Sequence, residues 1–163
     1  MELALIGLGK MGLNMATRLT RGGQRVVGYA RTKESVESAV NNGAEGAFSL
    51  EEAVGKLSSS PKVVWVMVPA GTATTETIEK ASALLKKGDI IIDGGNSNYK
   101  ETIKHAEMLA AKGIDFVDCG TSGGIWGLTE GYSLMIGGRL EVTEKLRPIF
   151  ETHSFSLHNN PPL

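Results

Sequence analysis

The spacing of three glycines near the start of the chain restricts its fold more than any other feature. Gly7, Gly9 and Gly12 come directly after an apolar run at residues 2–7, and residues 11–21 follow with apolar side chains every three or four positions. The run is typical of a strand buried on both faces, and the spacing is typical of one face of a helix. Strand, glycine turn and helix in this order predict a βα unit that binds the pyrophosphate of a dinucleotide.

Each glycine of this G-x-G-x-x-G motif has its own expected role. Gly7 makes the tight turn, Gly9 lets the backbone approach a pyrophosphate, and Gly12 lets the helix pack against the strand. The free N–H groups at the start of the helix then bind the phosphates. The alternative is an ordinary βα turn that binds no ligand.

Strand and helix patterns alternate along most of the chain. Strands are expected at residues 25–30, 62–68, 89–93, 114–118 and 132–136, and helices at residues 33–42, 50–57, 74–85, 98–112 and 141–150. This alternation predicts a Rossmann-type, doubly wound α/β fold, with a mostly parallel sheet and helices on both faces. We expect a dinucleotide-binding domain at residues 1–150 and an irregular tail at residues 151–163, which contains Asn-Asn-Pro-Pro.

Composition excludes several classes of partner. The 17 basic and 18 acidic residues give a net charge of −1, so there is no overall basic field to hold nucleic acid or an anionic membrane. No apolar stretch is long enough to span a membrane, and the N-terminus does not resemble a signal peptide. Cys119 is a lone cysteine and has no intramolecular disulfide partner. We expect a cytoplasmic protein that binds neither nucleic acid nor membrane.

The end of the second expected strand indicates which cofactor is preferred. An acidic residue there would bond the ribose 2′-hydroxyl of NAD, but this chain has Ala30, Arg31 and Thr32. A guanidinium and a hydroxyl suit a 2′-phosphate, and one charged hydrogen bond contributes about 1.5–3 kcal/mol. NADP is therefore the expected cofactor. The alternative is that Arg31 and Lys33 form a solvated loop and the site accepts NAD as well.

Two further glycine clusters follow later strands, at residues 93–97 (DGGNS) and 120–124 (GTSGG). Together with residues 7–16 (GLGKMGLNMA), they resemble the cofactor domain of the decarboxylating 6-phosphogluconate dehydrogenases, over about the first 150 residues. Residues 68–71 (VPAG) and 126–128 (WGL) are similar to the shorter form of that enzyme. The DGGNS segment is more specific than the glycine loop, which the wider β-hydroxyacid dehydrogenase group shares.

The resemblance implies an activity and a set of site residues. The activity is oxidation of 6-phosphogluconate at C3, with hydride passing to the nicotinamide, and then loss of C1 as carbon dioxide to give ribulose 5-phosphate in the pentose phosphate pathway. The implied cofactor contacts are Gly7, Leu8, Gly9, Lys10, Met11 and Gly12 at the pyrophosphate, Ala30, Arg31 and Thr32 at the ribose, and Val68, Pro69, Ala70 and Ala73 along the cofactor. Asn96 would lie between nicotinamide and sugar acid, and Ser122, Gly123 and Gly124 would bind the sugar acid.

Simpler interpretations exist for these residues. Asn96 is also placed to cap a helix that begins near Asn98, and Ser122 would fit an unliganded glycine turn. His105 is expected to be a surface or packing residue. The other histidines, His153 and His158, lack the spacing of a metal site, so no metal is expected.

In this family, the general base lies outside the part of the enzyme that this chain resembles. The family carries a lysine in a Lys-x-x-Asn-x-x-Glu-Tyr segment that begins its helical region, and residues 146–163 of this chain contain no lysine. Because oxidising an alcohol needs a group that takes its proton, we expect these 163 residues to bind cofactor but not to catalyse alone. The family's dimer interface, formed largely by that helical region, is not carried over. Two alternatives are a domain of a 3-hydroxyisobutyrate-type dehydrogenase, which DGGNS argues against, and a non-catalytic dinucleotide-binding module.

Overall fold

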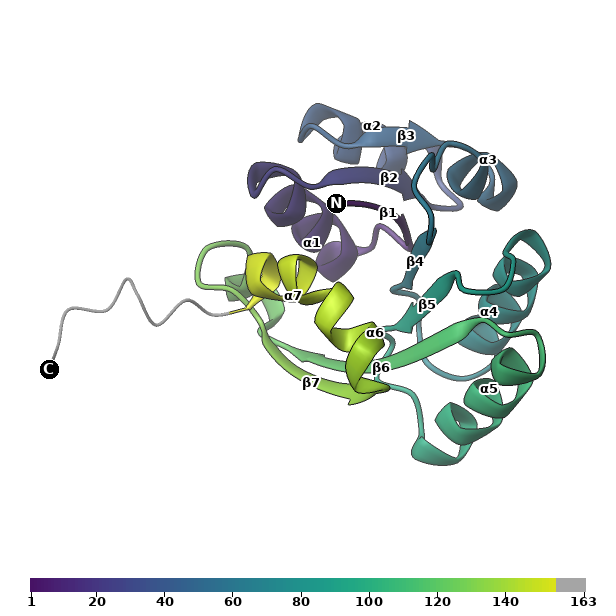
Figure 1. Ribbon diagram of the computed structural model, residues 1–163. Helices are drawn as coiled ribbons and strands as arrows, with labels where there is room; N and C mark the ends of the chain where they lie inside the picture. Colours follow the sequence, from purple (N-terminus) through teal and green to yellow (C-terminus); the bar gives the residue numbers. More distant parts are fainter. Residues whose placement is uncertain (155–163) are drawn as a thin grey trace, which may run out of the picture.

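The fold is a seven-stranded sheet with helices on both faces (Figure 1). The computed structural model describes residues 1–154, with the backbone alone at Ile125. The strand order is β3-β2-β1-β4-β5-β6-β7, in which β1 to β6 are parallel and β7 is antiparallel to β6. The strands are β1 (Glu2–Ile6), β2 (Arg25–Tyr29), β3 (Glu45–Ala47), β4 (Val63–Val66), β5 (Ile90–Asp93), β6 (Asp115–Ser122) and β7 (Ser133–Gly138). The helices are α1 (Lys10–Arg21), α2 (Lys33–Asn41), α3 (Leu50–Gly55), α4 (Thr72–Leu84), α5 (Tyr99–Ala111), the 3-10 helix η1 (Gly124–Leu128), α6 (Leu140–Lys145) and α7 (Arg147–His153).

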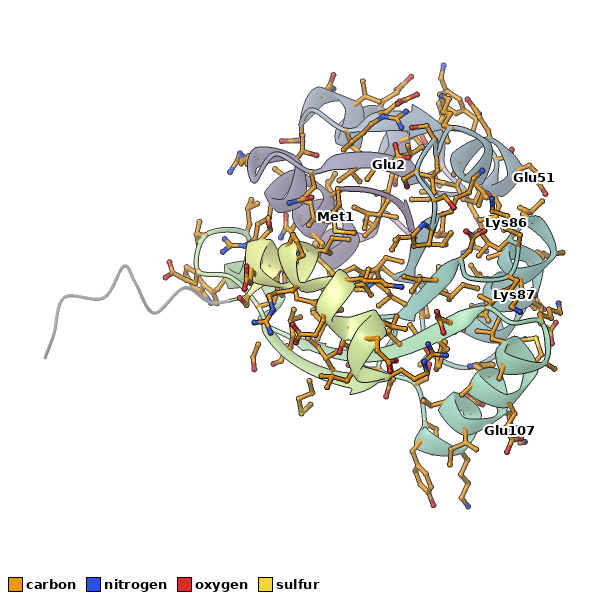
Figure 2. All side chains as sticks on the ribbon, viewed as in Figure 1. Met1, Glu2, Glu51, Lys86, Lys87 and Glu107 are labelled. Carbon is orange, nitrogen blue, oxygen red and sulfur yellow. The ribbon has the colours of Figure 1, made fainter. Side chains whose placement is uncertain are left out.

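The strands divide the core into two layers because successive side chains point to opposite faces. Leu3 and Leu5 belong to the layer that contains buried residues of α1, α2 and α7, whereas Ala4 belongs to the layer with α3, α4 and α5. Figure 2 shows side chains filling the space between the sheet and both helical layers. In the first layer, Trp65 of β4 is fully buried and packs edge-on against Phe150 of α7, with 5.9 Å between ring centroids.

The structure confirms the predicted doubly wound, mostly parallel sheet. It adds the short strand β3, which has only the residues Glu-Gly-Ala and no β-branched pattern that would reveal it. It also extends β6 to Ser122, past the expected end at residue 118, because residues 117–122 pair with β7. No helix in the described part of the chain is long and apolar enough to cross a bilayer.

The end of the fold differs from the expectation of one helix at residues 141–150 and an irregular tail from residue 151. Leu146 separates α6 from α7, and Pro148 lies in the first turn of α7. Helix α7 then continues through His153, so residues 151–153 are helical rather than irregular. Tertiary contacts hold this turn, because the Arg18 guanidinium donates to the carbonyl of Thr152 and the ring of His153 packs on Trp65. The rest of the expected tail, residues 155–163, lies outside the described residues.

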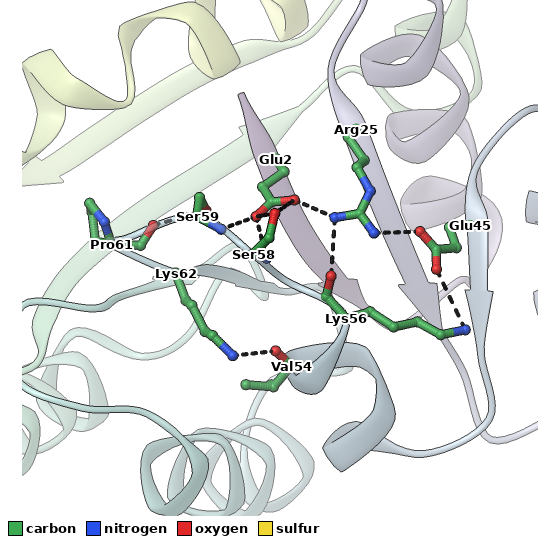
Figure 3. Close-up of polar contacts among 9 residues, drawn as sticks. All are labelled: Glu2, Arg25, Glu45, Val54, Lys56, Ser58, Ser59, Pro61 and Lys62. Atoms are coloured by element: carbon green, nitrogen blue, oxygen red, sulfur yellow. Dashed lines mark hydrogen bonds and ion pairs between the residues drawn. The ribbon is translucent and has the colours of Figure 1, made fainter.

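A polar network ties the amino ends of the first strands together (Figure 3). Glu2 accepts hydrogen bonds from Arg25 and from the backbone of Ser58 and Ser59, and Arg25 also pairs with Glu45 at 2.6 Å. Burial alone would raise the pKa of Glu2, but these hydrogen bonds outweigh it and lower the pKa to about 2. The network lies at the opposite edge of the sheet from the glycine loop, so its role is structural.

Candidate functional site

A cavity of about 410 Å³ opens at the carboxyl ends of β1, β2 and β4. Residues 6–9 and 67–69 line its inner part, and the amide of Met67 donates to the carbonyl of Ile6 at 2.7 Å to hold the two segments together. The chain turns from β1 toward β2 on one side and β4 lies on the other, so the strand order reverses here. Ligands of open α/β sheets bind outside such a reversal point.

The three glycines of the loop are glycine for different reasons. Gly7 has φ +103°, and a Cβ there would overlap the backbone of Met67. A Cβ at Gly12 would overlap the carbonyl oxygen of Gly7. At Gly9, by contrast, φ is −64° and a Cβ would meet no atom within 4 Å. The fold therefore requires glycine at Gly7 and Gly12, whereas open space lies over Gly9, which lines the cavity.

The start of α1 suits a phosphate group. Gly9 is the N-cap and has no side chain to bond the first N–H groups of the helix, and the first turn of α1 has no acidic residue. Such N–H groups attract anions, and a bound phosphate would fill the space above Gly9. The residues present therefore fit the pyrophosphate of a dinucleotide.

The outer part of the cavity is lined by the loop between β2 and α2. Ala30, Arg31, Thr32 and Ser35 all border it. Thr32 is the N-cap of α2, yet its hydroxyl donates to the Ser35 hydroxyl at 2.7 Å and makes no capping bond to the helix backbone. Arg31 is exposed and forms no ion pair with any described residue. The loop and the first turn of α2 thus supply one cation and two hydroxyls.

Helix α4 forms the facing wall, most of which sequence reasoning missed. Ala73, Glu76, Thr77 and Lys80 line the cavity, and their spacing of three and four places them on one face of the helix. Ala73 was predicted, and extending its helix face by two turns would have found the other three. The lining residues that were not predicted are Ile6, Tyr29, Ser35, Leu50, Met67, Glu76, Thr77 and Lys80.

The other predicted site residues divide into two groups. The cavity brings together Gly7, Leu8, Gly9, Ala30, Arg31, Thr32, Val68, Pro69 and Ala73. Lys10, Met11, Gly12, Ala70, Asn96, Ser122, Gly123 and Gly124 are not among its lining residues. Gly12 packs on Gly7 instead. The last four residues of this list, from Asn96 onward, lie together at the ends of β5 and β6.

Asn96 joins the ends of β5 and β6. Its side-chain amide donates to the carbonyl of Thr121 at 3.3 Å and accepts from the amide of Thr121 at 3.1 Å. Asn96 has φ +54°, a left-handed conformation that asparagine tolerates. The helix cap is Asn98, whose side chain accepts from the amide of Lys100, so the capping alternative for Asn96 is wrong.

The loop around Asn96 is set by Asp93, at the end of β5. One carboxylate oxygen accepts from the amide of Gly95 at 2.9 Å, and the other accepts from the Ser97 hydroxyl at 2.7 Å. The following strand, β6, ends at the exposed Ser122, and positive φ values at Gly123 and Gly124 turn the chain into η1. Two glycine-containing loops therefore lie side by side, next to the cavity at the ends of β1, β2 and β4 along the sheet edge.

Cys119 and His105 are poor candidates for chemistry. Burial raises the pKa of the Cys119 thiol to about 12, and its side chain is fully buried. His105 is buried on α5, where its ring lies 3.0 Å from the Thr75 hydroxyl and packs against Phe116. Within residues 1–154, no three His, Cys, Asp or Glu side chains gather to hold a metal ion.

A second, larger cavity of about 730 Å³ lies between α5 and the strands β6 and β7. Ile103, Ala106 and Phe116 give it apolar walls, and Arg139 pairs with Asp115 at its rim at 3.3 Å. It borders neither the glycine loop nor the reversal of strand order. The smaller cavity, which has the helix start that fits a phosphate, is therefore the candidate nucleotide site.

Comparisons with known proteins identify the family of this chain. The family model for the NAD binding domain of 6-phosphogluconate dehydrogenase matches residues 2–158. An NAD(+)-dependent, decarboxylating 6-phosphogluconate dehydrogenase from Haloferax volcanii is 39% identical over 151 residues, which cover 93% of this chain and 49% of the relative. The chain thus spans about half the length of that curated relative.

Solved structures add two further similarities. The 6-phosphogluconate dehydrogenase of Plasmodium falciparum, described with its cofactor NADP+ and its substrate, is 30% identical with a TM-score of 0.90, over 99% of this chain and 36% of that one. A 3-hydroxyisobutyrate dehydrogenase of Mycobacterium tuberculosis has a TM-score of 0.86 at 24% identity, over 94% of this chain and 52% of that one, which shows a shared fold. The chain belongs to the family of NAD-binding domains of 6-phosphogluconate dehydrogenases.

Proposed function

We propose that this chain is the cofactor-binding part of an NADP-dependent 6-phosphogluconate dehydrogenase. The observation that carries the proposal is the open space above Gly9, at a position where neither the backbone conformation nor the packing requires glycine. A bound pyrophosphate explains that space, because it must approach the N–H groups of α1 more closely than a Cβ allows.

The preference for NADP rests on the outer part of the cavity. The loop after β2 offers the Arg31 guanidinium and the Thr32 hydroxyl, the first turn of α2 adds the Ser35 hydroxyl, and none of these cavity-lining residues carries a carboxylate. A carboxylate at this place would bond the ribose hydroxyl of NAD and repel a 2′-phosphate. Relatives exist of both kinds, since one is named as NAD(+)-dependent and another is described with NADP+.

The sugar acid is proposed to bind where Asn96 meets the end of β6. When bound, the cofactor supplies the nicotinamide that accepts a hydride from C3 of the sugar acid. The Asn96 amide is held in place by Thr121, and we propose that Gly123 and Gly124, two and three residues further along the chain, offer backbone N–H groups to an anion. We prefer 6-phosphogluconate to 3-hydroxyisobutyrate because the DGGNS segment and the closer sequence match both indicate the former.

No described side chain is assigned as the proton acceptor. Asp93 uses both carboxylate oxygens in hydrogen bonds within its own loop, and the high pKa of Cys119 keeps that thiol protonated. The family resemblance implies a base in the helical domain that these enzymes carry. We accordingly propose that residues 1–163 bind the nucleotide without oxidising the sugar acid by themselves. We also propose a cytoplasmic location, in keeping with the unpaired Cys119.

Calorimetric titration with NADPH and NADH tests the proposal. We expect NADPH to bind more tightly than NADH by about tenfold or more, which corresponds to one charged hydrogen bond. Arg31→Ala should lower this preference by about tenfold. Arg21→Ala is the matched control, because Arg21 is exposed at the end of α1 and does not line the cavity. Equal affinities of the wild-type chain for the two nucleotides would refute the NADP preference.

A further inference from the structure

Lys80 lies on the wall of the cavity that faces the loop after β2. It is the last of the four α4 residues that line the cavity, two helical turns beyond Ala73. Arg31 and Ser35 line the same cavity from the other side. The lining of the cavity thus contains one cation from each of two separate elements.

The charge of Lys80 is not used within the fold. Glu76 precedes it by four residues on the same face of α4, an arrangement that commonly forms an ion pair. Glu52 and Lys56, at the same spacing on α3, do pair at 2.8 Å. Lys80 has no acidic oxygen within 4 Å among the residues that the structure describes, and the same is true of Arg31.

The charges at the cavity fit an anion. Lys80 and Arg31 give two positive charges among its lining residues, and Glu76 gives one negative charge. The chain as a whole is slightly acidic, with a net charge of −1, so this local excess of positive charge opposes the overall balance. A phosphate monoester carries a charge of about −1.5 to −2 at neutral pH, and the 2′-phosphate is the group that distinguishes NADP from NAD.

We propose that Lys80 is a specificity-determining residue. It contacts the ribose 2′-phosphate of NADP from α4, while Arg31 contacts the same phosphate from the loop after β2. The inference rests on the proposed function, and it adds a second element to the site that selects the cofactor. Lysine is suited to this place because its flexible side chain brings a point charge to the phosphate without a fixed hydrogen-bond geometry.

The test compares three variants by titration with NADPH and with NADH. Lys80→Met should raise the dissociation constant of NADPH by about tenfold and leave that of NADH within about twofold, since only NADPH has the phosphate. Lys80→Arg should keep most of the affinity for NADPH. Lys86→Met is the matched control, because it removes the same charge just beyond the end of α4 (Figure 2), outside the cavity lining.

The outcomes separate this inference from the proposed function. If the wild-type chain binds neither nucleotide, the proposed function fails. If it binds NADPH and Lys80→Met binds NADPH equally well, the role of Lys80 is refuted while the proposed function stands. An equal loss for NADPH and NADH would also refute it, because a general effect on adenosine binding or on folding would weaken both. Urea unfolding of each variant checks that the fold is intact.

Discussion

Replacing Gly9 by alanine should separate nucleotide binding from stability. The backbone at Gly9 has φ −64°, which alanine adopts without strain, and the added methyl group would meet no protein atom within 4 Å. A Gly→Ala change at a compatible position stabilises a protein by about 0.4–1 kcal/mol through the unfolded chain. The free energy of unfolding of Gly9→Ala should therefore be unchanged or slightly higher.

The same methyl group should weaken NADPH binding. It would occupy the space in which the pyrophosphate approaches the N–H groups of α1, and losing one charged hydrogen bond costs about 1.5–3 kcal/mol. This cost corresponds to a rise in dissociation constant of about ten- to 150-fold. The assay is calorimetric titration of NADPH, with urea unfolding of the same sample.

Gly12→Ala is the comparison variant, because here the added methyl group should lower the stability of the fold. Its methyl group would overlap the carbonyl oxygen of Gly7, and overpacking of this kind typically costs about 1–3 kcal/mol of stability. Gly12→Ala should therefore unfold at lower urea concentration than the wild type, whereas Gly9→Ala should not. The reasoning is refuted if Gly9→Ala folds normally and binds NADPH as tightly as the wild type.

Three further predictions concern other parts of the structure. Burial, and secondarily the charge of Arg18, lower the pKa of His153 to about 3, so between its ordinary value of 6.5 and about pH 5 the unfolded chain takes up a proton that the folded chain does not. As the pH is lowered through this range, which lies above the range in which Glu2 titrates, the free energy of unfolding should fall by about 1.4 kcal/mol per pH unit. Urea titrations of His153→Gln should not show this pH dependence, and an unchanged pH dependence in the variant would contradict the assignment to His153. Arg18→Met should lower the free energy of unfolding by about 2 kcal/mol, because the guanidinium donates to carbonyls of residues 128, 129, 152 and 154, and an unchanged urea midpoint would show that these bonds contribute nothing. Cys119 should not react with iodoacetamide at about pH 8 until the chain is unfolded, because it is fully buried with a raised pKa, and rapid modification of the folded chain would show otherwise.

The glycine loop was predictable because its constraints are local. A turn that needs positive φ at Gly7 and a helix that packs directly on that turn at Gly12 leave a fixed spacing in the sequence. The residues after β2 were predictable for a similar reason, since the ends of neighbouring parallel strands lie at one edge of the sheet. Arg31 and Thr32 do line the cavity with the loop.

The α4 wall and the last helix were harder to predict because they depend on tertiary packing. Which face of α4 borders the cavity is decided by how the helix sits on the sheet, so Thr77 and Lys80 were missed although Ala73 was identified. At the end of the fold, Thr152 and His153 show no helical pattern of their own, and contacts with Arg18 and Trp65 hold them in α7. Pro148 did mark the start of α7, and that local signal was overlooked.

The cavity at the ends of β1, β2 and β4 is proposed to bind the nucleotide. The most direct test is NMR titration of the isotopically labelled chain with NADPH, which follows backbone amide signals residue by residue. If the nucleotide binds there, saturable shifts should be concentrated at residues 7–12, 30–35 and 73–80, which include the cavity-lining segments of the loop, β2–α2 and α4. Binding in this cavity is ruled out if millimolar NADPH shifts no signals, or if the shifts are confined to the second cavity, around residues 102–118 and 137–139.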